Sequence, residues 1–313
     1  MANKYGVLDL GSNTFHLKIV KFNREKIVDH FKHKEFIQFG LATKSSGKVK
    51  SKYRKKSIEA LSRISEIIKK DPPSYLKVIA TNSLRNINDN DFLKDMEKAL
   101  GSSIKVISPE QEGKLIYDGV VKTTDIPSKD YYIIDIGGSS TEIIFVKNNS
   151  INKVHSFNIG SLTLNEKFFL TEEPVKNWHE SIIYLSDFFS ELHELRMGNK
   201  DSKTSENSFA FGTSGTIKSV IRSIDFLRHE SKQKYFLNDF DYISHVLMNY
   251  NNFYNEEKKS LKKFIDKNRL DIMLSGLSIL YTIMIILNIN SMVKANGALR
   301  EGVLYKLFQN QNK

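Results

Sequence analysis

A gapless internal repeat constrains the fold of this chain more than any other feature. The run DLGSNTFHLKIV, which starts at Asp9, aligns without gaps on DIGGSSTEIIFV, which starts at Asp135, 126 residues further on. Each copy reads as the end of a strand, an aspartate, a turn of small residues and a second strand. This spacing is far longer than the roughly 20–50 residues of a solenoid repeat. We therefore expect two related domains.

Length and composition agree with two domains and exclude several kinds of site. The chain has 313 residues, which suggests about two domains of ordinary size. It contains no cysteine, so disulfides, thiolate metal sites and a cysteine nucleophile are excluded. The net charge of +11 permits a polyanionic ligand. Only nine of the 47 basic residues are arginines, however, and a general enrichment in lysine could produce much of this charge. We expect no specific nucleic-acid partner.

One segment is long enough to span a membrane. Residues 272–293 carry no charge. Polar residues nevertheless recur at helical spacing along and beside it, at Asp271, Ser275, Ser278 and Thr282. The pattern favours a buried core helix, with a membrane span as the alternative. The N-terminus shows no apolar stretch after a basic start, so we expect no secretory signal and a cytoplasmic location.

The repeated turns are candidate phosphate sites. Glycine, serine and threonine in a tight turn can point several backbone N–H groups at one anion, and hydroxyl groups add donors. An aspartate at the head of each turn is suited to hold a divalent cation or an attacking water beside that anion. A third turn of the same kind follows a strand near residue 211. The candidate phosphate-binding residues are Gly11, Ser12, Asn13 and Thr14, then Gly137, Gly138, Ser139, Ser140 and Thr141, and finally Gly212, Thr213, Ser214 and Gly215.

Two further residues have the chemistry of phosphoryl-group hydrolysis. Glu112 lies in the first turn of a helix predicted to begin at Pro109, and the following Gly113 suggests a close approach at this point. A carboxylate in an anion site suits a general base that deprotonates water. Arg85 follows a predicted strand and is suited to neutralise phosphoryl oxygens. Glu110, by contrast, is explained by the helix dipole. His16, which aligns with Glu142, suits a substrate contact and a packing role equally. Zinc-site histidine spacings and a P-loop are both absent from the sequence.

Six motifs together resemble the Ppx/GppA phosphatases, the exopolyphosphatase and guanosine pentaphosphatase family. They occur in the family's order along nearly the whole chain. They read DLGSNTFH from Asp9, ATNSLR from Ala80, PEQEG from Pro109, DIGGSSTE from Asp135, GTSGT from Gly212 and GALREGVLY from Gly297.

The resemblance implies an α/β fold of two RNase-H-like domains, the actin-like ATPase superfold, around an interdomain cleft. The domains would comprise residues 1–122 with about 300–313, and residues 123–299. It also implies an exopolyphosphatase in which Glu112 activates water, with Arg85, Asp135 and Glu142 in catalysis. Mg²⁺, or alternatively Mn²⁺, would lie near Asp135 and Glu142, with Asp9 as a further candidate ligand.

Three alternatives to an exopolyphosphatase remain open. The substrate could be guanosine pentaphosphate (pppGpp) or another nucleotide, or the protein could be a non-catalytic sensor that binds polyphosphate or an alarmone of the (p)ppGpp type. A kinase of the same superfold is disfavoured because no sugar-binding signature accompanies Glu112. A homodimer is also left open by the sequence.

The chain departs from the family pattern at two places. Ser139 stands where the family has a third glycine, which would cost about 1 kcal/mol if that position requires a positive φ. The region before Phe39 reads Lys34-Glu-Phe-Ile-Gln38 and lacks an arginine that is frequent in the family. One phosphate contact would then be lost or made by a lysine.

Overall fold

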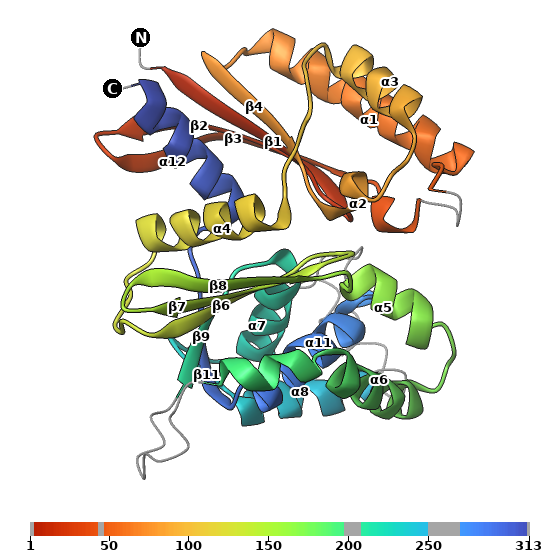
Figure 1. Cartoon of the computed structure of the whole chain (residues 1–313), viewed down its shortest axis with the longest axis vertical. Coiled ribbons are helices and arrows are strands. Elements are labelled where there is room, and N and C mark those ends of the chain that lie inside the picture. The colour runs from red at the N-terminus through yellow and green to blue at the C-terminus, as the bar shows by residue number, and fades with distance from the viewer. Residues whose placement is uncertain (1–2, 43–46, 197–207, 250–269, 312–313) are drawn as a thin grey trace. The chain divides into compact units, whose positions relative to one another are not determined.

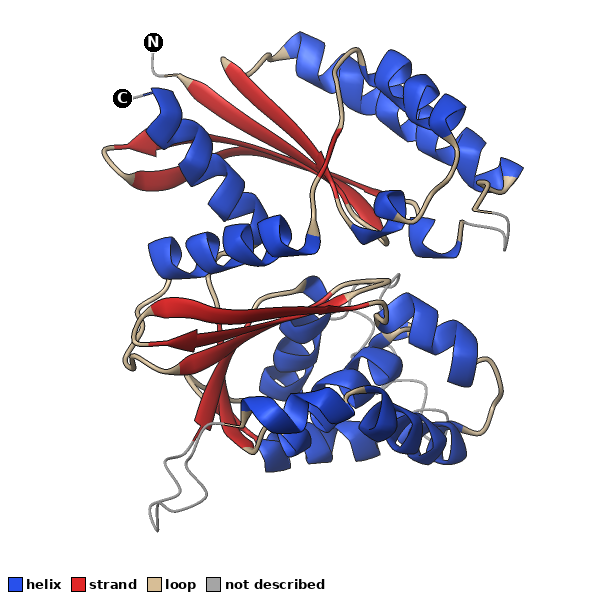
Figure 2. Ribbon diagram, in the orientation of Figure 1, coloured by secondary structure: helices blue, strands red, loops and turns tan. Residues whose placement is uncertain are grey.

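The computed structural model describes residues 3–42, 47–196, 208–249 and 270–311. The chain divides into two compact units, one formed by Met1–Thr124 with Gly297–Lys313, the other by Asp125–Asn296. Each unit is built on one β-sheet with helices packed against it (Figures 1 and 2).

Unit 1 contains a five-stranded sheet in the order β3-β2-β1-β4-β5. Helices α1 and α3 cover one face of this sheet, and α4 and α12 lie on the other (Figure 1). The strands are β1 (Lys4–Leu10), β2 (Thr14–Asn23), β3 (Lys26–Phe36), β4 (Tyr75–Ala80) and β5 (Lys105–Val106). The helices are η1 (Phe39–Leu41), α1 (Ser51–Lys70), α2 (Asn82–Arg85), α3 (Asn90–Leu100), α4 (Pro109–Thr123) and α12 (Leu299–Gln311).

Unit 2 contains a six-stranded sheet in the order β10-β11-β9-β6-β7-β8. Its strands are β6 (Tyr131–Ile136), β7 (Thr141–Lys147), β8 (Ser150–Phe157), β9 (Ser208–Gly212), β10 (Tyr235–Phe236) and β11 (Ile289–Lys294). Its helices are α5 (Ser161–Phe168), α6 (Pro174–Phe188), η2 (Ser190–Leu195), α7 (Gly215–Arg228), α8 (Leu237–Met248) and α11 (Met273–Ile286). The main core joins one face of the sheet to α6, α7, α8 and α11.

The sequence repeat is a structural repeat in register. In unit 1 Asp9 lies opposite His16 in the β1–β2 pair, and in unit 2 Asp135 lies opposite Glu142 in the β6–β7 pair. The pairing with the third strand also matches. The β2–β3 pair shifts register between Ile19 and Val20, and the β7–β8 pair shifts register at the equivalent place, between Phe145 and Val146. A parallel strand, β4 or β9, then joins the first strand of each hairpin. Five strands therefore follow the same order in both sheets, with β10 as an additional edge strand in unit 2, and the expected two-domain α/β fold is confirmed.

Helices α4 and α12 cross through two glycines. A Cβ atom added at Gly119 would lie 1.9 Å from the carbonyl oxygen of Ala298, and one added at Gly302 would lie 1.9 Å from that of Leu115. Only glycine permits two helix backbones to approach this closely. The crossing fixes α12 against α4, the helix whose first turn carries Glu112.

The uncharged segment 272–293 is a helix followed by a strand. Helix α11 ends at Ile286, and β11 begins at Ile289. Between them Asn288 takes the left-handed conformation (φ 54°), which asparagine tolerates better than most residues and which ends the helix. The prediction of a buried helix is correct for the first part of the segment and wrong for the last. No helix within the described ranges is both long enough and apolar enough to cross a membrane.

Candidate active site

The start of α4 holds Glu112 in a defined place. Ser108 caps the helix with a reciprocal capping box, in which its hydroxyl accepts from the backbone N–H of Gln111 and the Gln111 side chain accepts from the backbone N–H of Ser108. Pro109 occupies the first turn, as the sequence predicts. Glu112 is 5% exposed, whereas Glu110 in the same turn is exposed. Hydrogen bonds from its own backbone N–H and from Ser108 lower the pKa of Glu110, which agrees with a role at the helix terminus.

Arg85 contacts Glu112 directly. Its Nη1 donates to Glu112 Oε2 at 2.7 Å and to the carbonyl oxygen of Ile107 at 2.8 Å. Both side chains of the pair are largely buried. The sequence singled out both residues but gave no reason to join them. The guanidinium group orients the carboxylate, so Arg85 supports Glu112 in addition to any contact with phosphate that the sequence predicts.

The first turn, Gly11–Thr14, is linked to the helix that carries Arg85. The turn closes with a hydrogen bond from Gly11 N to Thr14 O at 3.1 Å, and Ser83 of α2 donates its hydroxyl to Ser12 Oγ at 2.6 Å. Asn13 is 7% exposed, and neither its amide nitrogen nor its amide oxygen has a hydrogen-bond partner among the described residues. A buried amide without partners is costly unless a ligand or water completes it. In this turn the Asn13 side chain is therefore the strongest candidate for hydrogen bonds to a bound ligand.

Asp9, at the head of the first turn, pairs with an arginine from the far end of the chain. Arg300 Nη1 lies 2.9 Å from Asp9 Oδ2. Sequence reasoning missed Arg300, although it stands in the GALREGVLY motif and is one of only nine arginines. The motif was the available signal. Because the guanidinium neutralises this carboxylate, Asp9 is a weaker candidate metal ligand than its counterpart Asp135.

His16 lies opposite Asp9 and is held neutral. Its side chain is buried, and its Nε2 atom has no hydrogen-bond partner in the described part of the chain. Burial, followed by the positive charges of Arg300, Lys34, Lys18 and Lys32, lowers the pKa of His16 to about 2. A neutral imidazole beside the first turn has one donor nitrogen and one acceptor nitrogen but adds no charge.

The second turn, residues 137–140, has the same closure as the first. Gly137 N donates to Ser140 O at 2.8 Å. The turn also rests on the start of α5, since the backbone of Ser161 donates to Gly137 O and that of Leu162 to Gly138 O. Gly160 fits here because a Cβ atom would lie 2.6 Å from the backbone of residues 138 and 139. Ser139 does not adopt a positive φ, so the strain considered for it from the family pattern is absent.

Not every candidate hydroxyl in the turns is directed to a ligand. The hydroxyl of Thr141 donates to the carbonyl oxygen of Ile159 at 2.7 Å, and that of Ser214 caps α7 by accepting from Ile217 N. Gly212, at the end of β9, is crowded by Ile217 and Met292, and Gly215 begins α7. The structure gives these residues a role in forming the turns, and their contacts with phosphate remain a prediction from the sequence.

Asp135 and Glu142 form a carboxylate pair on one face of unit 2. They are directly opposite in the β6–β7 ladder, so their side chains project to the same side. Thr213 from the third turn donates its hydroxyl to Asp135 Oδ2, and Ser156 donates to Glu142 Oε1 at 2.9 Å. In the ranges that the structure describes, no cluster of three or more histidine or carboxylate side chains could hold a metal alone. Mg²⁺ needs only one or two carboxylates when substrate phosphates and waters complete its shell, so this pair fits it.

Comparison with known proteins gives one consistent family. The model of the Ppx/GppA phosphatase family matches residues 19–311. A protein named guanosine-5'-triphosphate,3'-diphosphate pyrophosphatase from Pseudoalteromonas translucida is 28% identical over 97% of this chain and 59% of its own length. A relative of the same name from Photobacterium profundum has the same identity and coverage. The chain thus spans about 59% of the length of these curated relatives.

Solved structures of the same family share the fold. An exopolyphosphatase from Cytophaga hutchinsonii superposes with a TM-score of 0.83 at 21% identity, covering 98% of both chains. A Ppx/GppA family member from Aquifex aeolicus superposes with a TM-score of 0.77 at 21% identity over the full length of both chains. At this level of identity the likeness establishes the fold and leaves the reaction to be argued from the site.

Proposed function

Because the chain belongs to the Ppx/GppA phosphatase family, we propose that it hydrolyses the terminal phosphoanhydride bond of inorganic polyphosphate. The observation that carries this proposal is the buried Glu112 carboxylate, held by Arg85 on a helix that is tied to the first turn. A binding protein has no need of a buried, oriented carboxylate beside an anion site, whereas a hydrolase needs a base there.

In the proposed reaction Glu112 accepts a proton from a water molecule as its oxygen bonds to the terminal phosphorus. The phosphoanhydride bond breaks, the shortened chain keeps the bridging oxygen, and orthophosphate leaves. The first turn, in the same unit as Glu112, holds phosphate oxygens through backbone N–H groups and serine hydroxyls, and Asn13 completes its amide hydrogen bonds on the substrate. Arg85 keeps Glu112 in the orientation that this transfer requires.

We include Mg²⁺ in the proposal, for which Asp135 and Glu142 of unit 2 would supply carboxylate ligands. When bound, it would supply positive charge that neutralises the phosphate oxygens. Thr213 and Ser156 orient the two carboxylates for this purpose. Removal of divalent cations by a chelator should therefore abolish phosphate release, and Mg²⁺ or Mn²⁺ should restore it.

The decisive experiment compares two neighbouring glutamates on α4. Glu112→Gln should reduce release of orthophosphate from polyphosphate by at least about 10²-fold while binding of polyphosphate is retained. Glu110→Gln is the matched control, because Glu110 lies in the same helical turn but is exposed; its activity should stay close to that of the wild type. Undiminished turnover in Glu112→Gln would refute the assignment of the base. A wild-type protein that binds polyphosphate but releases no phosphate with either cation would instead indicate a sensor.

A second candidate substrate is guanosine pentaphosphate. The relatives from Pseudoalteromonas translucida and Photobacterium profundum carry names that point to this nucleotide, and the same residues would serve its hydrolysis. Values of kcat/KM for long polyphosphate, guanosine pentaphosphate and GTP, measured side by side, separate the two. A preference for the nucleotide above about tenfold would transfer the proposal to it.

A further inference from the structure

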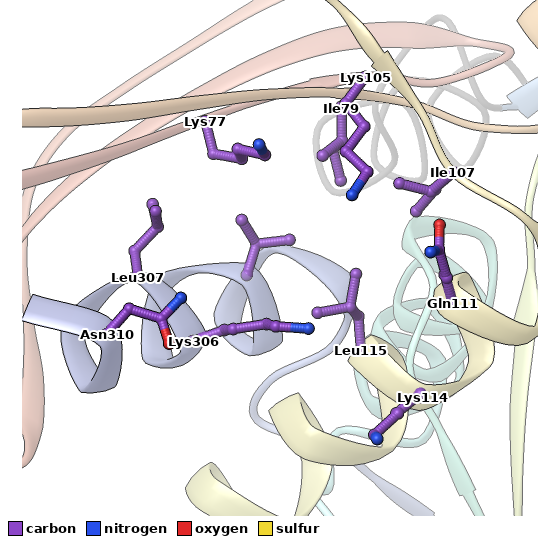
Figure 3. A pocket seen from close by; sticks show the side chains of 11 residues that line it. Lys77, Ile79, Lys105, Ile107, Gln111, Lys114, Leu115, Lys306, Leu307 and Asn310 are labelled. Carbon is purple, nitrogen blue, oxygen red and sulfur yellow. The ribbon is translucent and has the colours of Figure 1, made fainter. Parts of the chain in front are cut away.

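Unit 1 contains a pocket whose lining includes none of the residues assigned to hydrolysis. It is bounded by β4, β5, α4 and α12 and has a volume of about 290 Å³ (Figure 3). This is the small end of the range for ligand pockets, which is roughly 300–1,000 Å³. The pocket suits a small molecule rather than a polymer.

The lining of the pocket combines an apolar floor with a basic rim. Five aliphatic side chains form the floor, namely Ile79, Ile107, Leu115, Val303 and Leu307. Four lysines surround it, Lys77, Lys105, Lys114 and Lys306. In Figure 3 the ammonium groups of Lys77, Lys105 and Lys306 lie around the space between the strands and the helices, and Lys114 lies at the α4 rim. A ligand for such a lining needs an apolar body and negative charge.

The positive charges of the four lysines are not neutralised by ion pairs within the described part of the protein. None of them forms an ion pair or a side-chain hydrogen bond with any other described residue. The nearby carboxylate is that of Asp118, a partly buried residue of α4 whose charge is felt by Lys114 and Lys306. No carboxylate is among the residues that line the pocket, so its lining is net positive. Such a pocket attracts an anion.

Two amide side chains narrow the choice of ligand. Gln111 and Asn310 lie at opposite parts of the lining, on α4 and α12. The Gln111 oxygen accepts from Ser108 N, so its amide nitrogen is the atom with remaining donors. An amide group can form hydrogen bonds with the polar edge of a flat heterocycle, and an aliphatic surface can pack against its face. Lysine ammonium groups are suited to bind a phosphate. Bare polyphosphate would make no use of the apolar floor.

We propose that this pocket binds a small phosphorylated heterocycle of the nucleoside monophosphate class, at a site distinct from the two phosphate turns. The phosphate contacts Lys105 and Lys306, the ring lies on Leu307 and Ile79, and Gln111 and Asn310 contact its edge. Binding at this pocket does not depend on whether the protein hydrolyses polyphosphate.

The test measures equilibrium binding of AMP and GMP by calorimetry. The double variant Lys105→Gln/Lys306→Gln should weaken binding at this site by about tenfold or more, because two charge-assisted contacts are lost. Leu307→Trp keeps every charge but fills the pocket and should weaken binding to a similar extent. The matched control is Lys69→Gln/Lys98→Gln, which removes the same charge from exposed positions elsewhere in unit 1 and should bind as the wild type does.

Several outcomes would overturn the proposal. They are the absence of AMP and GMP binding in the wild type, equal binding in the pocket variants and the wild type, and equal weakening in the control variant. Two control ligands test the ligand class: guanosine lacks the phosphate, and tripolyphosphate lacks the ring. Affinity of either one equal to that of GMP would refute a nucleoside monophosphate site. Unfolding midpoints of all variants in urea verify that a loss of binding does not come from a loss of fold.

Discussion

Replacement of Gly119 by alanine has two opposite effects on the stability of the protein, and the structure shows which of them is larger. Within a helix, alanine is favoured over glycine by about 1 kcal/mol, so helix propensity alone predicts a more stable protein. Packing predicts the reverse. The new Cβ atom would lie 1.9 Å from the Ala298 carbonyl oxygen and 2.9 Å from the backbone nitrogen of Gly302. Side-chain Cβ atoms essentially never approach other atoms closer than 3.0 Å.

The magnitude follows from the atom that is contacted. A clash with a flexible side chain is relieved by a rotamer change, but here the obstacle is the backbone at the start of α12, which must move by about 1 Å. Overpacking costs about 1–3 kcal/mol and occasionally more, and a backbone obstacle belongs at or above the upper limit. After subtraction of the gain in helix propensity, Gly119→Ala should lower the free energy of unfolding by about 2 kcal/mol or more.

Urea denaturation followed by circular dichroism measures this quantity. Lys122→Ala is the matched control, because Lys122 is an exposed residue on the same helix, and it should change the free energy of unfolding by less than about 0.5 kcal/mol. The reciprocal variant Gly302→Ala meets the Leu115 carbonyl oxygen at 1.9 Å and should be destabilised to a similar degree. Unchanged or increased stability in Gly119→Ala would refute a close crossing of α4 and α12 at these glycines.

Three further predictions concern the candidate site. The pKa of His16 is lowered to about 2 in the folded protein, against about 6.5 when unfolded, so its contribution to stability is complete above pH 6.5 and declines as the pH falls toward 2. In urea titrations, the difference in unfolding free energy between wild type and His16→Gln should therefore fall between pH 7 and pH 5, by at most about 1.4 kcal/mol per pH unit; a constant difference would contradict the burial of a neutral imidazole. Arg85→Gln removes the guanidinium group from the buried Glu112 carboxylate and should cost about 3 kcal/mol, part of which the double variant with Glu112→Gln should recover; strict additivity in this cycle would argue against the pairing. Ser139→Gly should lower the free energy of unfolding by about 0.5 kcal/mol, because Ser139 has no positive φ that glycine would relieve and glycine makes the unfolded chain more flexible; an increase in Tm would instead reveal strain at that residue.

The fold was predictable because local patterns repeat. The aspartate, the small-residue turn and the alternating strand recur at Asp9 and Asp135, and these patterns alone indicate two equivalent hairpins. Helix boundaries were less accessible. The start of helix α1 at Ser51 is one example, because its first turn is rich in lysine and has no side-chain cap to mark the start. The end of α11 depends on the backbone conformation of Asn288, which periodicity does not report.

Individual site residues were predictable, but their partners were not. Glu112 and Arg85 each have the residue type and position that phosphate chemistry requires, yet their contact depends on how α2 and α4 pack. The pair of Asp9 and Arg300 joins residues 291 positions apart, a separation over which no local pattern extends. The neutral state of His16 likewise arises from burial and from charges that four separate positions contribute.

The placement of α12 has a consequence for biosynthesis. Unit 1 contains both the N-terminal strands and residues 297–313, so all of unit 2 must be translated before α12 exists. At about 5–20 residues per second, the first sheet waits on the order of ten seconds or more with one face lacking this helix, while the continuous unit 2 emerges. The exposed face includes Tyr5 and Phe22, whose rings later contact Phe308. A nascent chain of this protein therefore offers a long-lived apolar surface to chaperones, and a premature stop codon near its end would leave the Glu112 helix without its neighbour.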